Sequence, residues 1–207
     1  SQQVPVIAAA MLVAIRETQA HGPYRIGGWS FGGVLAYEIA RQLRAQGERI
    51  GFLGLIDSHH PSAHRDDPQT DATPVEALGQ SCGRALQAAD ASASDGLAAH
   101  LECSMLADGS SASQSHALRR RLLGYQDALR RYHPQPIDTA VRLFVAEQRS
   151  DSLLPALGWE RCVPAVALRL QTVPGNHRSM MQSPQIEVLA QALAAGADDH
   201  AALGAQA

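Results

Sequence analysis

One serine of this chain lies in a pattern that fits a catalytic nucleophile, the G-x-S-x-G sequence of Gly28, Trp29, Ser30, Phe31 and Gly32. Between a strand and a helix, this pattern forms a sharp turn, the nucleophile elbow, which strains the serine backbone and presents its hydroxyl. We expect glycine at Gly28 and Gly32 because the chain passes so close there that side chains would clash. The Phe31 backbone N–H, at the start of the helix, is the predicted donor to a developing oxyanion.

A serine hydroxyl is a weak nucleophile at neutral pH, so Ser30 needs a neighbouring base and a group that orients this base. His177 is the predicted base among the nine histidines of the chain. It follows the last predicted strand in the sequence VPGNH, where a loop places it at the carboxyl edge of a parallel sheet. The chain order of serine, acid and histidine is the one that accompanies this elbow.

Three carboxylates are candidates for the acid that orients His177. Asp57 ends the predicted strand that comes after the elbow helix, and Asp151 follows the next predicted strand. Both would lie at the same edge of the sheet as Ser30. Glu147 is a third and weaker candidate. Position in the sequence does not choose between Asp57 and Asp151.

Hydrophobic periodicity predicts alternating strands and helices around these residues. The predicted strands are residues 24–29, 50–56, 141–146 and 166–173. The predicted helices are residues 4–20, the repeat of Leu35, Ile39 and Leu43 that ends near Gly47, and residues 186–193. A strand, a helix and a strand in close succession predict a parallel sheet with right-handed crossovers. The expected fold class is therefore α/β.

The sequence also predicts an insertion between two parts of the α/β core. Residues 61–136 are rich in Ser, Ala, Asp and Gln, and their patterns predict only helices, at residues 75–86, 97–106 and 118–132. We expect this segment to be a helical lid. The core then consists of residues 1–60, which contain the elbow, and residues 137–196, and residues 197–207 are expected to be a frayed tail.

Three segments together resemble the thioesterase domains that end nonribosomal peptide synthetases and polyketide synthases, which are α/β-hydrolases. They are GPYRIGGWSFGGVLAYEIARQL (22–43), LGLIDSHHP (53–61) and VPGNHRSMMQSP (173–184). The resemblance covers nearly the whole chain and implies that residues 61–136 form the lid of that family. In the family the acid follows the strand after the elbow helix, so the resemblance favours Asp57 over Asp151.

The resemblance has one departure, at the start of the chain. Family members have further strands before the elbow strand, and a loop after one of them supplies the second oxyanion donor. Here only the predicted helix at residues 4–20 precedes the elbow strand. We therefore expect this chain to be an N-terminally truncated portion of such a domain, and the second donor is not assigned. Without its neighbours, the elbow strand would become an exposed edge.

The resemblance implies a thioesterase that releases an acyl or peptidyl chain from phosphopantetheine on a carrier protein. The acyl or peptidyl group would first form an ester with Ser30 and would then be released by hydrolysis or macrocyclisation. The implied partner is an acyl or peptidyl carrier protein, the upstream domain of the same synthase, and no permanently bound cofactor is expected. A generic serine esterase or lipase is one alternative, and an inactive fragment or carrier-docking module is another.

Composition excludes several other classes of protein. The 207 residues include 17 Lys and Arg against 20 Asp and Glu, a balance that argues against nucleic-acid binding. No apolar run or leader sequence predicts a membrane or secreted protein, so a cytoplasmic location is expected. Pro61 would break any helix that could align Asp57 with the histidines near it, and these residues match no known ligand spacing, so no metal site is predicted.

Overall fold

The computed structural model describes residues 3–64, 124–125, 127–149 and 154–204. It forms two compact units, one made of Ser1–Ala63 with Tyr132–Ala207 and the other of His64–Arg131. The predicted helices at 75–86 and 97–106 lie outside the described residues. Of the predicted helix at 118–132, residues 124–125 and 127–131 are described and are helical. The role of this segment as a lid stays a prediction.

The first unit is built on a sheet of parallel strands, as the sequence predicted. The strands, in the order in which they lie side by side, are β1 (Tyr24–Trp29), β2 (Ile50–Ile56), β3 (Val141–Ala146) and β4 (Leu168–Val173). Trp29 pairs with Ile56, Ile56 with Phe144 and Ala146 with Val173, so the carboxyl ends of the strands lie within two residues of one another in register. The loops that follow the strands therefore leave from one edge of the sheet.

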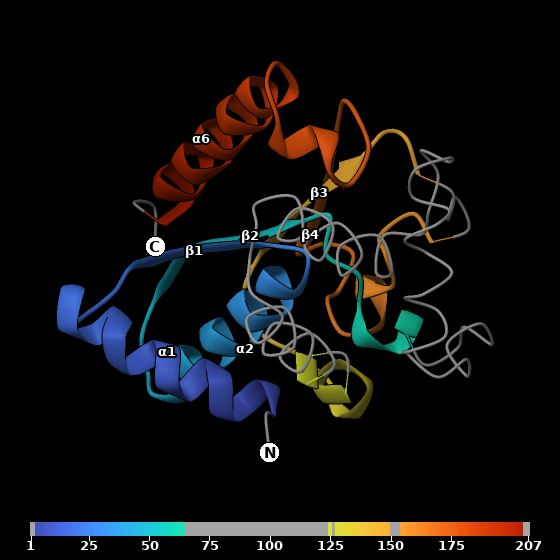
Figure 1. The fold of residues 1–207 in the computed structure, drawn as a ribbon. Helices are drawn as coiled ribbons and strands as arrows, with labels where there is room; N and C mark the ends of the chain where they lie inside the picture. Colours follow the sequence, from blue (N-terminus) through green and yellow to red (C-terminus); the bar gives the residue numbers. More distant parts are fainter. Residues whose placement is uncertain (1–2, 65–123, 126, 150–153, 205–207) are drawn as a thin grey trace, which may run out of the picture. The chain divides into compact units, whose positions relative to one another are not determined.

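Helices cover both faces of this sheet (Figure 1). Helices α1 (Val4–Thr18) and α2 (Phe31–Ala45) lie on one face, and α6 (Gln185–Gly204) lies on the other. Gly47 has a φ of +80°, and its N–H donates to the carbonyl of Arg44. A left-handed glycine in this place ends α2, as predicted.

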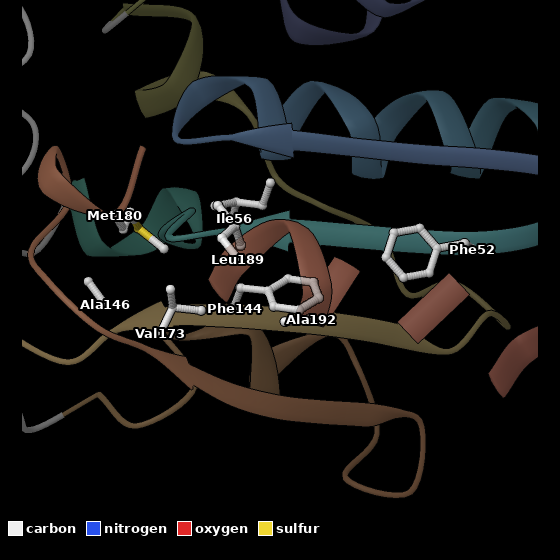
Figure 2. Close-up of a cluster of buried hydrophobic side chains, with 8 residues drawn as sticks. All are labelled: Phe52, Ile56, Phe144, Ala146, Val173, Met180, Leu189 and Ala192. Carbon is white, nitrogen blue, oxygen red and sulfur yellow. The ribbon is translucent and has the colours of Figure 1, made fainter. Parts of the chain in front are cut away.

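Buried side chains fill both spaces between helices and sheet, which explains why the central strands β2 and β3 are mostly buried. Between α6 and the sheet, one cluster consists of Phe52, Ile56, Phe144, Ala146, Val173, Met180, Leu189 and Ala192 (Figure 2). A second cluster joins α1 and α2 to the start of the sheet and consists of Ala8, Leu12, Tyr24, Ile39 and Leu43.

Some boundaries differ from the sequence prediction. Helix α1 ends at Thr18 rather than at residue 20. Strand β4 begins at Leu168 rather than at Val166, because the chain from Pro164 to Leu168 forms a turn in which the Ala167 N–H donates to the Pro164 carbonyl.

The largest difference is at the end of the chain. Helix α6 continues to Gly204, well beyond the predicted residues 186–193, and covers most of the segment 197–207 for which we expected a frayed tail. This segment is rich in alanine, the strongest helix former, and that propensity accounts for the extension.

Within the described residues, β1 lies at one edge of the sheet and β4 at the other. The same part of the chain contains no helix that combines the length and the hydrophobicity needed to cross a membrane.

Candidate functional site

The serine of the G-x-S-x-G sequence lies at a sharp turn between β1 and α2. Ser30 has a φ of 55° and a ψ of −124°, a conformation that few residues other than glycine adopt. Its N–H donates to the carbonyl of Ile56 at 2.9 Å, which continues the pairing of β1 with β2. Its own carbonyl accepts from the Gly33 N–H at 3.0 Å and from the Ser58 hydroxyl at 2.7 Å. The turn is therefore held from two sides, by the first turn of α2 and by the residues after β2.

The elbow needs glycine at only one of the two positions predicted from the motif. A Cβ atom on Gly28 would lie 2.1 Å from the carbonyl oxygen of Gly32, which is far inside van der Waals contact. Among the residues that the structure describes, a Cβ on Gly32 would meet nothing within 4 Å, so the clash predicted at Gly32 does not arise within this part of the chain. The second crowded glycine is Gly33, whose Cβ would lie 2.6 Å from the Ser58 hydroxyl oxygen.

Asp57 lies directly after β2 and contacts His177. Its Oδ2 is 2.7 Å from the Nδ1 of His177, and its Oδ1 accepts from the Ala146 N–H at 2.9 Å. Asp57 is only 3% exposed and has a φ of 43°, a second residue in the left-handed region. Each carboxylate oxygen therefore has a partner, so this buried charge is well compensated.

His177 lies in the loop that follows β4 and is 9% exposed. The loop is shaped by Asn176, whose side-chain oxygen accepts from the N–H groups of Arg178 and Ser179. A carboxylate can only accept, so the contact with Asp57 requires a proton on Nδ1, and the neutral imidazole with this proton has its lone pair on Nε2. Nε2 is buried and has no hydrogen-bond partner among the described residues. The imidazole is therefore in the tautomer that a general base requires.

Trp29 contacts both the ring and the backbone of His177, an arrangement that sequence analysis missed. The two rings are stacked, with centroids 4.8 Å apart and planes inclined by 26°. The indole N–H of Trp29 also donates to the His177 carbonyl at 3.1 Å. The only signal in the sequence is that Trp29 directly precedes Ser30. This position does not predict a contact with His177, which is far away in the sequence.

The other acid candidates do not form this contact among the residues that the structure describes. Glu147 is exposed, and its backbone N–H continues the β3–β4 pairing by donating to the Val173 carbonyl. Asp151 lies outside the described residues. Asp57 is thus the candidate acid that the structure brings to His177.

His60, one of the histidines near Asp57, belongs to the packing around this edge. The Nδ1 of His60 is 2.8 Å from the Ser62 hydroxyl, and the His60 ring lies edge-on to Trp159. Within the described ranges, no group of three or more His, Cys, Asp or Glu side chains could hold a metal ion.

Comparison with known proteins identifies the family. The family model "Thioesterase domain" matches residues 2–195. The chain belongs to this family. It is therefore a thioesterase domain, as the three sequence segments implied.

Curated relatives of this thioesterase domain are large synthases. It is 31% identical over 193 residues to the non-reducing polyketide synthase terA of Aspergillus terreus, covering 88% of this chain and 9% of that protein. It is 53% identical over 53 residues to the N-(5-amino-5-carboxypentanoyl)-L-cysteinyl-D-valine synthase of Penicillium rubens, covering 26% of this chain and 1% of that protein. The chain thus spans a tenth or less of the length of these relatives.

Solved thioesterase structures share the fold. The NocB thioesterase domain, in covalent complex with a fluorophosphonate nocardicin G analogue, superposes with a TM-score of 0.69 and 26% identity, over 95% of this chain and 75% of that one. RedJ superposes with a TM-score of 0.63 and 22% identity, over 93% and 70% of the two chains. The expected α/β-hydrolase fold is confirmed.

Proposed function

We propose that this thioesterase domain releases an acyl or peptidyl chain from the phosphopantetheine arm of a carrier protein, through an ester on Ser30. The main support is the buried pair of Asp57 and His177, joined at 2.7 Å, whose imidazole ring stacks on Trp29, the residue before Ser30 in the elbow. The similarity to polyketide and peptide synthases supports a substrate held on a carrier protein, because such synthases assemble their products on carriers.

In the first step the Ser30 hydroxyl oxygen attacks the thioester carbonyl and Nε2 of His177 takes the hydroxyl proton. Asp57 holds the imidazole through Nδ1 and stabilises the imidazolium that forms. The Phe31 N–H, at the start of α2, donates to the oxyanion of the tetrahedral intermediate. The carbon–sulfur bond then breaks, the phosphopantetheine leaves as a thiol with the proton from His177, and the acyl chain stays on Ser30.

In the second step His177 activates the group that attacks the ester on Ser30. This group is a water molecule, which gives a free acid, or a hydroxyl or amine of the same acyl chain, which gives a ring. The proton moves to Nε2 of His177 and then to the Ser30 oxygen as the ester bond breaks. Ser30 is thereby restored for the next chain.

The deciding experiment compares the unaltered domain with Ser30→Ala on acyl-pantetheine thioesters. Mass spectrometry should detect an acyl adduct on the unaltered protein and none on Ser30→Ala, while circular dichroism shows both folded. A fluorophosphonate probe that still labels Ser30→Ala would falsify the assignment of the nucleophile. The absence of any acyl adduct on the unaltered protein would favour a docking module without activity.

A second comparison separates the proposed acid from its alternative. Asp57→Asn should lower kcat by about 10⁴-fold, because an amide in place of the carboxylate favours the wrong imidazole tautomer. Asp151→Asn should leave kcat within a few-fold. Turnover of oxygen esters with the same acyl group, at rates equal to those of the thioesters, would favour a generic esterase.

A further inference from the structure

Ser58 has a buried hydroxyl that the proposed reaction steps do not use. The residue is 0% exposed and follows Asp57 directly. Its hydroxyl donates to the Ser30 carbonyl at 2.7 Å, and its own carbonyl accepts from the indole N–H of Trp159 at 2.6 Å. Ser58 is thus bonded on one side to a buried tryptophan and on the other to the backbone of the elbow.

The bond to Ser30 constrains more than a single carbonyl. The Ser30 C=O and the Phe31 N–H belong to one peptide unit, which is planar and, when trans, has the two groups pointing in opposite directions. Any rotation that turns the Phe31 N–H must also turn the Ser30 carbonyl. A donor that fixes the carbonyl therefore fixes the direction of the N–H.

Two donors hold this carbonyl, and they come from different elements. The Gly33 N–H, at 3.0 Å, belongs to the first turn of α2 and moves with the elbow itself. The Ser58 hydroxyl is attached to the end of β2, next to Asp57. Ser58 therefore fixes the elbow peptide relative to the strand that bears the proposed acid.

We propose that Ser58 is a positioning residue that holds the Ser30–Phe31 peptide so that the Phe31 N–H points at the oxyanion of the intermediate. This inference rests on the proposed function. Two consecutive residues then orient two different groups of the site: Asp57 orients the base, and Ser58 orients the oxyanion donor. The Ser58 hydroxyl also requires a glycine at Gly33, because a side chain at that position would displace the hydroxyl.

The test replaces Ser58 by alanine and separates binding of the intermediate from binding of the substrate. Loss of a complete oxyanion donor costs about 10²–10³-fold in rate, so a misdirected donor should cost roughly tenfold in kcat/KM. Affinity for a boronic acid with the same acyl chain, which forms a tetrahedral adduct on serine, should fall by the same factor. Affinity for an unreactive thioether analogue of the acyl-pantetheine should not change. Active sites are counted with a fluorophosphonate, so a loss of folded protein does not imitate the effect.

Ser62→Ala is the matched control. Ser62 is also buried, but its hydroxyl contacts the His60 ring instead of the elbow. This variant should keep the kcat/KM and the boronate affinity of the unaltered domain. Ser58→Cys retains a weak donor, so its losses should lie between those of the unaltered domain and Ser58→Ala, and it replaces Ser58→Ala if the latter does not fold.

Two results would overturn the inference. One is an equal weakening of boronate and thioether binding in Ser58→Ala, and the other is that both kcat/KM and boronate affinity stay unchanged. Both leave the proposed function standing, because the unaltered domain still turns over thioesters. Turnover by Ser30→Ala would contradict the proposed function itself.

Discussion

Ser30 and Asp57 share an unusual backbone conformation at the ends of two neighbouring strands. Their φ values are 55° and 43°, in the region where side chains are normally strained. Hydrogen bonds from neighbouring strands hold both: Ser30 donates to Ile56, and Asp57 donates to Phe144 at 2.7 Å. Both strained residues thus lie where a side chain must leave the sheet edge at a defined angle; Leu157, with a φ of 51°, is a further strained residue outside the site.

The two motif glycines should respond differently to alanine. Gly28→Ala should lower the free energy of unfolding by about 2–4 kcal/mol, because its Cβ would overlap the Gly32 carbonyl. Gly32→Ala should be neutral or stabilising by up to about 1 kcal/mol, since alanine is the better helix former and no described residue lies within 4 Å of the added Cβ. Urea unfolding of both variants measures the difference. Equal destabilisation by the two substitutions would contradict this steric analysis.

Trp29 should support catalysis through its two contacts with His177. Trp29→Phe keeps an aromatic ring but loses the indole N–H, so kcat/KM should fall by about 3–10-fold, which is the value of one hydrogen bond. Trp29→Leu also loses the ring stacking, which is worth a further ~0.5–1.5 kcal/mol, so its kcat/KM should fall further than that of Trp29→Phe. Steady-state kinetics on an acyl-pantetheine thioester, corrected for active-site content, checks both values. An unchanged kcat/KM in Trp29→Leu would show that the contact is incidental.

At the scale of elements, a buried charge on α2 is bonded to Tyr132, near the end of the segment predicted as the insertion. Glu38 is 0% exposed and accepts from Arg41 at 2.7 and 2.8 Å, from Gln42 at 2.9 Å and from the Tyr132 hydroxyl at 2.7 Å. Burial by itself raises the pKa of Glu38, but the hydrogen bonds from Arg41, Gln42 and Tyr132 outweigh it and hold the pKa below its ordinary value. The ionised carboxylate therefore stabilises the folded state.

This carboxylate should make stability depend on acid pH. Because the pKa is lower in the folded than in the unfolded state, the stabilisation is complete above the unfolded value of about 4.3 and is lost as the pH falls through the folded value. Glu38→Gln should lower the free energy of unfolding by about 2 kcal/mol at pH 7 and flatten its fall below about pH 4.5. Urea unfolding at a series of pH values measures both effects. Parallel pH profiles for the two proteins would exclude Glu38 as the cause.

At the scale of the whole molecule, the site is assembled from residues that are far apart in the sequence. Asp57 and His177 are separated by 120 positions in the sequence. Asp57 follows β2 and His177 follows β4, and β3 lies between these two strands in the sheet. Their contact requires these strands to lie side by side, and α6 packs on the same sheet through the cluster of Figure 2. Catalytic geometry and global stability should therefore be lost together.

Leu189, in the core cluster of Figure 2, tests this coupling. Leu189→Ala should lower the free energy of unfolding by about 2–5 kcal/mol through the cavity that it leaves. The neighbouring Val188 is 44% exposed against 2% for Leu189, so Val188→Ala should change stability by less than about 0.5 kcal/mol. As the urea concentration rises, fluorophosphonate labelling of Ser30 should be lost with the same midpoint as the helical signal in circular dichroism. Labelling that survives beyond that midpoint would show that the site is independent of the α6 packing.

Much of the fold could be predicted because local patterns report it directly. The strands at 24–29, 50–56 and 141–146 coincide with the observed ones, since buried parallel strands are short apolar segments between turns. Helix α6 was underestimated because its alanine-rich end has little hydrophobic periodicity, although its propensity for helix is high.

The chemistry-bearing residues were also visible in the sequence, but their contacts were not. The glycine-flanked serine and the histidine after the last strand stand out because strand ends and turns have local signatures. The choice among Asp57, Asp151 and Glu147 could not be made from position, because all three follow strands that end at the same edge of the sheet. A contact between two side chains depends on register and on backbone angles such as those of Asp57, which no local pattern encodes.

The amino-acid sequence alone was sufficient to establish an α/β domain with a nucleophile elbow and a histidine at the sheet edge, because periodicity and turn chemistry are properties of neighbouring residues. Only the tertiary structure decided that Asp57 meets His177, that Trp29 stacks on the same ring, that Ser58 holds the elbow carbonyl and that Gly32 has room for a side chain. The physical reason is distance: these facts depend on how segments separated by tens of residues pack, and packing is determined by the whole chain at once.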